Sequence, residues 1–174
     1  MNLKYEIEFL DYWHLGSGLS AGASLDSSVI KDSDELPYLS GKTLKGLARE
    51  MAELLGYGDF VKTCFGSEGT SMGVCYFANA IVDSTVAKEI ITNKLQNSLY
   101  SSIASTQIKE GIAVTNSLRE IEVVIPITLY GEILDIPDEY KDNMMESLKM
   151  IKRMGLNRNR GLGRCEFKEF SCKS

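Results

Sequence analysis

The sequence predicts an α+β domain. Three observations predict it: apolar and polar residues alternate where strands are expected, two segments have the apolar spacing of amphipathic helices, and the order is strand, helix, strand, strand, helix, strand. This βαββαβ order is typical of a ferredoxin-like (RRM-like) core. Because that fold serves many functions, it does not decide the function here.

The N-terminal half supplies the first strand, the first helix and the second strand. The first strand is predicted by alternation at Leu3, Tyr5, Ile7 and Phe9. Residues 14–40 follow as a Gly/Ser/Asp-rich loop, longer than a compact domain normally carries without a functional reason. A helix is predicted from a Ser40 N-cap to a Gly56 stop, and a strand over 73–82.

The C-terminal half completes the core. Residues 85–100 favour a further helix, and 101–117 are polar and irregular. Pro126 places the third strand near an edge or a bulge, since proline cannot donate to a ladder; this strand alternates at Ile121, Val123, Ile125, Ile127 and Leu129. The second core helix is marked by Tyr140, Met144, Leu148 and Ile151, and the last strand begins at Cys165 and Phe167.

Composition is that of a globular protein. The 174 residues are 44% hydrophobic and 25% charged, with a net charge of -5, and we expect one domain over 1–174. There is no apolar run near the ~20 residues that span a bilayer and no signal-peptide core. For that reason we expect no membrane partner. Four cysteines without C-x-x-C spacing and one histidine argue against structural zinc, so we expect reduced thiols and a cytoplasmic location.

The most informative segment runs from Met150 to Phe167. It contains three glycines and, between residues 152 and 164, five cations and no carboxylate: Lys152, Arg153, Arg158, Arg160 and Arg164. Glycines let backbone N–H groups approach phosphate, and arginines grip it with two donors. A basic turn that complements a helix C-terminus would explain the first two cations but not the other three. The pattern therefore favours an anion site.

The first helix carries a second basic feature. Lys42, Lys45 and Arg49 fall within about 60° of each other on a helical wheel, opposite the apolar face. Most such stripes are simply solvated, and Glu53 limits this one to the N-terminal end. The SGKT at 40–43 resembles the end of a phosphate-binding P-loop, but Leu36 stands where that motif needs glycine, so a nucleotide hydrolase is a weak hypothesis.

The loop over 14–40 holds the residues with candidate chemistry. Asp32 and Asp34 fit turn positions before Pro37, where an aspartate bonds its own backbone. Asp26 lies between apolar residues and not in an obvious turn. His14 ends the first strand, where it could be structural, a general acid/base or an RNA-stacking contact.

Several motifs together carry a family resemblance. In order they are H-x-G-x-G, L-D-x-x-V-I-K-D, P-Y-L-x-G-K-T-L-K-G-x-x-R, C-F-G and N-R-G-L-G-R. The chain resembles the RAMP (repeat-associated mysterious protein) superfamily, the RNA-binding proteins of CRISPR antiviral-defence complexes. Within it, the likeness is strongest to the repeating backbone subunit of type III effector complexes. The match runs nearly end to end.

The resemblance implies a set of RNA contacts. The Gly-rich loop over 155–164 would line the guide-RNA groove, and Lys42, Lys45 and Arg49 would meet guide phosphates. Residues about 101–118 would form a thumb-like insertion that wedges into the guide–target duplex, with Ile108 and Lys109 as contacts. His14 matches the family's histidine after the first strand. The implied loop contacts are Asn157, Arg158, Arg160, Gly161, Gly163 and Arg164.

The resemblance also implies partners and chemistry. The partners would be guide RNA, complementary target RNA, copies of the chain or paralogous RAMP subunits in a helical backbone, and other effector subunits. Asp26 would be catalytic, either by holding Mg²⁺ or another divalent cation or by positioning the 2′-hydroxyl. RNA must then supply further metal ligands, so target cleavage would need the assembled complex.

Two alternatives stay open. One is a non-cleaving, purely structural RNA-binding subunit. The other is a repeat-RNA-processing endoribonuclease of the same superfamily, which would use His14 as general acid/base without metal.

Overall fold

The computed structural model describes residues 1–16, 27–67, 69, 71–105, 108, 109, 112, 113 and 119–173. Its core is an antiparallel sheet in the order β10-β1-β9-β4, which are the fourth, first, third and second core strands in the chain. The sheet confirms the predicted ferredoxin-like fold. Its strands are β1 (Asn2–Phe9), β4 (Tyr76–Phe77), β9 (Thr128–Leu134) and β10 (Cys165–Lys173).

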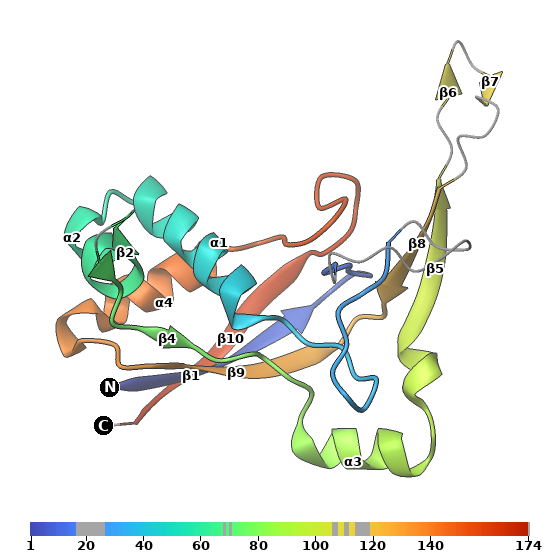
Figure 1. Cartoon of the computed structure of the whole chain (residues 1–174), viewed down its shortest axis with the longest axis horizontal. Helices are drawn as coiled ribbons and strands as arrows, with labels where there is room; N and C mark the ends of the chain where they lie inside the picture. Colours follow the sequence, from blue (N-terminus) through green and yellow to red (C-terminus); the bar gives the residue numbers. More distant parts are fainter. Residues whose placement is uncertain are drawn as a thin grey trace.

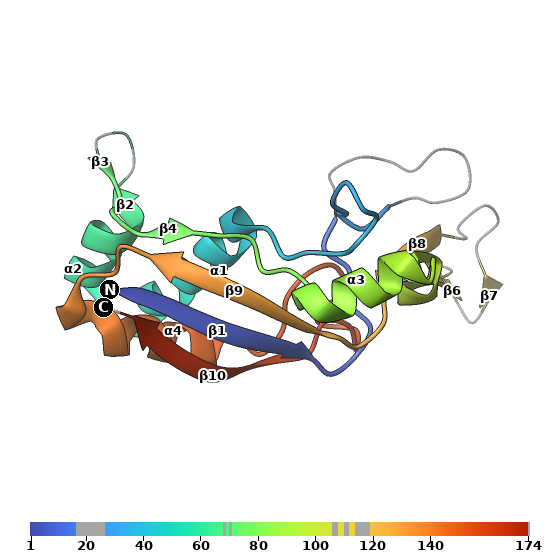
Figure 2. The ribbon, with the colours of Figure 1, turned by 90° about the horizontal axis from the view of Figure 1, so that it is seen from below.

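Helices α1 (Gly41–Leu54) and α4 (Lys141–Met150) cover one face of this sheet, whereas α3 (Ser84–Thr92) lies on its other side (Figures 1 and 2). The apolar half of the β1 alternation is buried, as predicted. Its residues pack in one cluster with the apolar side chains of α1 and α4, namely Leu44, Ala48, Ala52, Met144 and Leu148. Burial of this alternating face against two helices is what fixes the register of the sheet.

The ends of α1 follow the predicted signals. The Ser40 hydroxyl accepts from the Thr43 N–H at 3.1 Å, which satisfies one of the unpaired donors of the first turn. After the helix, Gly56 has a φ of 79°. Gly41 has a separate role, because a Cβ there would lie 1.9 Å from the Phe77 carbonyl oxygen of β4. The glycine of the Gly-Lys-Thr sequence is thus explained by close helix–strand packing.

Between α1 and β4 the chain forms short elements. These are α2 (Gly58–Phe60), the π-helix η1 (Val61–Phe65) and the hairpin of β2 (Gly66–Ser67) and β3 (Ser71–Met72). Phe65 of the C-F-G motif is buried, with its ring centroid 5.4 Å from that of Phe60 and 5.5 Å from that of Phe77. The motif therefore contributes an aromatic contact to the core.

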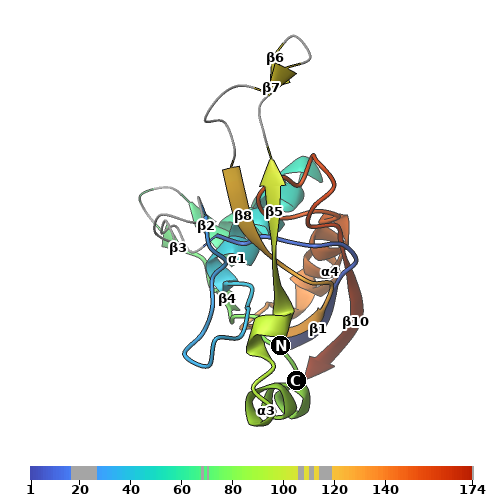
Figure 3. The ribbon, with the colours of Figure 1, turned by 90° about the vertical axis from the view of Figure 1, so that its right-hand side faces the viewer.

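A second unit extends from the core. After α3 and the 3₁₀ turn η2 (Gln96–Leu99), β5 (Tyr100–Ser105) pairs with β8 (Arg119–Val124), and we call this pair the β5–β8 ribbon. The strands β6 (Ile108–Lys109) and β7 (Ile112–Ala113) pair with each other beyond the far end of the ribbon (Figure 3). The one-turn 3₁₀ helix η3 (Asp138–Tyr140) precedes α4.

Four boundary predictions were wrong. The regular strand predicted over 73–82 is confined to Tyr76–Phe77. The ladder breaks at Asn79, which accepts the Gly41 N–H at 2.9 Å, and Ile81 pairs with Tyr130 of β9 again as an isolated bridge. The helix predicted over 85–100 ends at Thr92, two residues before Lys94 with its φ of 54°. The segment 101–105, predicted to be irregular, is part of β5. The single strand predicted over 121–129 is two strands in different sheets, separated at Pro126.

Among the described residues, no helix combines the length and the apolar character that crossing a bilayer requires.

Candidate nucleic-acid interface

The basic bend (residues 152–164) is held by backbone hydrogen bonds. Its two arms pair, with Met154 N–H donating to Gly163 O at 3.0 Å and Cys165 N–H donating to Lys152 O at 3.0 Å. The segment after β1 holds it from outside, since Leu156 N–H donates to His14 O at 2.9 Å and Gly163 N–H donates to Tyr12 O at 2.8 Å. The conformation of the bend is therefore fixed by hydrogen bonds, both within it and to the segment after β1.

Left-handed backbone at four positions shapes the bend. Gly155, Gly161 and Gly163 have φ values of 89°, 91° and 69°, and Asn157 has 56°. A Cβ at Gly155 would lie 2.2 Å from His14 O, and one at Gly163 would lie 1.9 Å from Met154 O, whereas Gly161 faces open space. Two of the three glycines are thus required for both conformation and close packing, and the third for conformation alone.

The arginines of the basic bend divide into two groups. Arg153 donates from Nη1 to Arg158 O at 3.1 Å, and Arg164 Nε lies 3.3 Å from Asp11 Oδ2. The side chains of Arg158 and Arg160 are exposed, and the structure records no hydrogen bond or ion pair for them among the residues it describes. Two guanidinium groups therefore remain available to an anion, each able to donate two hydrogen bonds to a phosphate.

The base of the basic bend is apolar. Cys165 is buried, and burial raises the pKa of its thiol to about 12, an effect that Lys152 only partly offsets. The neutral thiol donates weakly to Ile151 O at 3.9 Å. Cys165 is thus a packing residue at the start of β10.

The basic stripe of α1 is weaker than its sequence indicates. Arg49 Nε lies 2.8 Å from Glu53 Oε1, one helical turn away, and Lys45 Nζ lies 6.0 Å from the Phe77 ring centroid. Lys42 is exposed in the first turn, where the helix dipole also favours an anion. Helix α1 and the basic bend lie on the same side of the sheet (Figure 1).

His14 is 1% exposed and both of its ring nitrogens have partners. Nδ1 lies 2.6 Å from Glu122 O, and Nε2 lies 2.9 Å from the Ser27 hydroxyl. Because a carbonyl can only accept, Nδ1 carries a proton, and in the neutral ring Nε2 accepts from Ser27. With its carbonyl bound to Leu156, this histidine joins the end of β1, the basic bend, the loop and β8. Its contact with RNA stays a prediction.

Two predicted sites fall partly or wholly beyond the structural description. Asp26 lies outside the described residues. Ile108 and Lys109 are in β6, where the backbone is described but not the side chains. The described residues contain no group of three or more His, Cys, Asp or Glu side chains that could hold a metal ion. They do not form a protein-only metal site, and the roles of Asp26, Ile108 and Lys109 stay predictions.

Sequence reasoning missed Glu122. This carboxylate accepts hydrogen bonds from Val29 N–H at 3.0 Å and Lys31 Nζ at 2.9 Å. The signal that could have found it is a glutamate in the middle of an apolar strand, together with the lysine of V-I-K-D, since a half-buried carboxylate needs a cationic partner.

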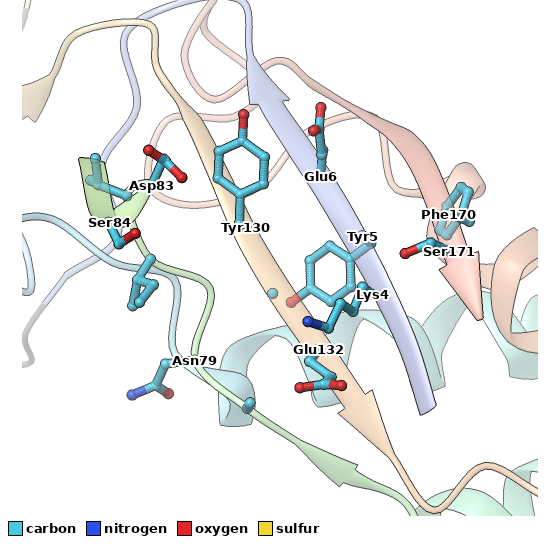
Figure 4. A pocket seen from close by; sticks show the side chains of 14 residues that line it. Lys4, Tyr5, Glu6, Asn79, Asp83, Ser84, Tyr130, Glu132, Phe170 and Ser171 are labelled. Carbon is cyan, nitrogen blue, oxygen red and sulfur yellow. The ribbon is translucent and has the colours of Figure 1, made fainter. Parts of the chain in front are cut away.

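The outer face of the sheet, turned away from α1 and α4, holds a cavity of about 760 Å³. Figure 4 shows that Glu6, Tyr130 and Glu132 line it from β1 and β9, and Asp83 from the start of α3. Among the described residues that line it, Lys4 is the single cation. RRM-type sheets stack bases on aromatic residues, but three carboxylates around Tyr130 disfavour a polyanion here.

Comparison with known proteins places the fold. The chain is similar to a chain in a cryo-EM structure of the type III-B Cmr-beta bound to cognate target RNA, with a TM-score of 0.73, 12% identity, and coverage of 97% of this chain and 96% of that one. It is equally similar to a chain in the apo state of Cmr-beta, with a TM-score of 0.74, 12% identity and the same coverage. At 12% identity these likenesses show the fold alone.

Sequence comparison shows the family. No curated protein matches this sequence. The family model described as the RAMP superfamily matches residues 6–166. Because that match covers most of its length, the chain belongs to the RAMP superfamily.

Proposed function

We propose that this chain is a guide-RNA-binding backbone subunit of a type III CRISPR effector complex. One observation carries the proposal: a basic bend held by backbone hydrogen bonds displays two guanidinium groups, those of Arg158 and Arg160, that have no partner among the described residues, on an otherwise acidic protein. Membership of the RAMP superfamily and the fold shared with chains of the type III-B Cmr-beta support it.

The geometry of the basic bend suits sequence-independent binding of RNA. The bend needs no further ordering when RNA binds, which lowers the entropic cost of binding. Arg158 and Arg160 would meet phosphates, and Lys42 would extend the positive surface along α1. Contacts of this kind position the strand and carry no sequence information, so base pairing would read the target.

Cleavage of the target is the finer part of the proposal. Asp26 would be the catalytic residue, and Mg²⁺ or another divalent cation the cofactor, with RNA and water supplying ligands that the described residues do not. A bound cation would polarise the scissile phosphate. Ser27 is next to Asp26 in the chain. Its hydroxyl donates to His14 Nε2 at 2.9 Å and its carbonyl accepts the Glu122 N–H at 3.1 Å, so the described end of the loop is held by two hydrogen bonds.

The position of His14 favours this function over repeat-RNA processing. A general acid/base must reach the proton that it transfers, and this imidazole is 1% exposed with both nitrogens occupied. Cutting of repeat RNA by the isolated protein in chelator would instead support the processing nuclease.

The test is to purify the chain with the products of its neighbouring genes. We expect a bound RNA of guide length, and Mg²⁺-dependent cuts at regular intervals in a complementary target. Asp26→Ala should preserve assembly and target binding but abolish these cuts. Asp34→Ala, a change at an exposed turn residue, is the matched control and should cut normally. The absence of bound RNA would contradict RNA binding, and normal cutting by Asp26→Ala would contradict only the catalytic assignment.

A further inference from the structure

Glu122 in β8 is bound to the loop at every polar group. Its N–H donates to Ser27 O at 3.1 Å and its carbonyl accepts from His14 Nδ1 at 2.6 Å. One carboxylate oxygen accepts the Val29 N–H at 3.0 Å, and the other accepts from Lys31 Nζ at 2.9 Å. A single residue of the β5–β8 ribbon thus holds alternate residues 27, 29 and 31.

The pair of Glu122 and Lys31 is largely removed from water. The two side chains are 14% and 24% exposed, and Lys31 Nζ also lies 3.9 Å from the Tyr100 ring centroid of β5. Burial, with the nearby Glu122, Glu35 and Asp32, raises the pKa of Tyr100, so its neutral hydroxyl donates to Glu35 O at 2.7 Å. Glu35 Oε2 lies 3.9 Å from Lys31 Nζ, too far for a strong competing contact. Removal of either charge would leave the other largely buried without its main counter-charge.

His14 connects these hydrogen bonds to the basic bend. His14 bonds to Glu122 and Ser27 through its ring and to Leu156 through its carbonyl. The ribbon, the loop from Ser27 to Lys31 and the bend therefore form one connected frame. Asp26 directly precedes Ser27 in the chain. A frame of this kind fixes the distance between a strand held at the bend and a group carried by the loop.

We propose that Glu122 and Lys31 are positioning residues, which fix the cleavage point of the target relative to the bound guide. This inference rests on the proposed function, namely cleavage at Asp26. We call the pair of Glu122 and Lys31 the clamp. It acts through the backbone of residues 27–31 and does not itself touch the reacting atoms. It predicts a loss of rate and of positional accuracy without a loss of target affinity.

The test uses the assembled complex with guide and target RNA. Glu122→Gln keeps the shape of the side chain but weakens its bonds, and Lys31→Met removes the cation. We expect each variant to lower the single-turnover cleavage rate at least about ten-fold and to spread the product ends over adjacent positions, because small misplacements of catalytic groups are costly. Target Kd should change less than about two-fold. Glu132→Gln, on the outer face of the sheet, is the matched control and should behave as the unmodified protein.

Two further measurements separate positioning from general damage. The double variant should lose less than the product of the two single losses, because neither charge is then left alone. Amide exchange at Val29 in the complex should accelerate in Glu122→Gln, while exchange in β1 stays unchanged. If the unmodified complex cuts the target and both single variants cut it at the same rate and positions, the positioning role of Glu122 and Lys31 alone would be overturned. An unmodified complex that never cuts would instead overturn the catalytic assignment on which it rests.

Discussion

The basic bend and the outer face of the sheet are opposite in construction and in charge. The bend is a glycine-containing backbone turn held by hydrogen bonds to residues 10–14, and it displays two guanidinium groups without a partner in the described part of the chain. The outer face is regular strand, and its cavity is lined by three carboxylates and one lysine. An RRM-like core often binds RNA on its open sheet, but here the distribution of charge favours the bend as the surface for a polyanion. The RNA surface proposed here therefore differs from the one that the fold alone would indicate.

The largest effect should come from the bend itself. The double variant Arg158→Ala/Arg160→Ala should weaken guide-RNA binding about 10- to 100-fold across sequences and reduce the slope of log K against log salt by about 1.4, since two phosphate contacts are lost on a single strand. Kd measured over a salt series checks this. Lys4→Ala, on the outer face of the sheet, is the control and should leave the slope unchanged. Adding Arg164→Ala should contribute less, because Asp11 already pairs with that guanidinium.

A smaller effect should distinguish two glycines of the bend. Both Gly161 and Gly163 have positive φ, but only at Gly163 would a Cβ clash with backbone, 1.9 Å from Met154 O. Gly163→Ala should therefore lower the free energy of unfolding by roughly 3 kcal/mol and weaken RNA binding, whereas Gly161→Ala should cost about 1 kcal/mol. Denaturant unfolding of both variants measures the difference. Equal costs would mean that the bend is not held as described.

The smallest effects should come from α1. Lys42→Ala should weaken guide binding about two- to five-fold, because one exposed cation is lost. Arg49→Ala should change it less than about two-fold, because Glu53 already neutralises Arg49. Competition binding at constant salt can compare the two. A larger loss for Arg49→Ala would show that RNA displaces Glu53, and would extend the RNA surface along the helix.

Local signals in the sequence predicted much of the fold. The alternation of β1, the Ser40 cap and the helix stop at Gly56 depend on neighbours a few residues apart, and all three were confirmed. The strand boundaries that failed depend on distant partners: Asn79 leaves its ladder to reach Gly41, thirty-eight residues earlier in the chain. Periodicity carries no information about such a contact.

In the candidate site, too, local features could be predicted from the sequence and contacts between distant residues could not. Glycine and arginine content predicted an anion-binding bend, but not which arginines stay unpaired, since Asp11 is remote from Arg164 in sequence. His14 was open to a structural, acid/base or stacking role, and only the Glu122 carbonyl and the Ser27 hydroxyl define its ring bonds. Counting charges overestimates a binding surface wherever the fold supplies counter-ions.

Ultraviolet cross-linking of the purified ribonucleoprotein, followed by mass spectrometry of the linked peptides, tests the central claim most directly. If the guide lies along the basic bend, the cross-linked peptides will come from residues 152–164 and from the start of α1. Cross-links concentrated at Tyr130 and Lys4 on the outer face of the sheet, with none on the bend, would contradict it.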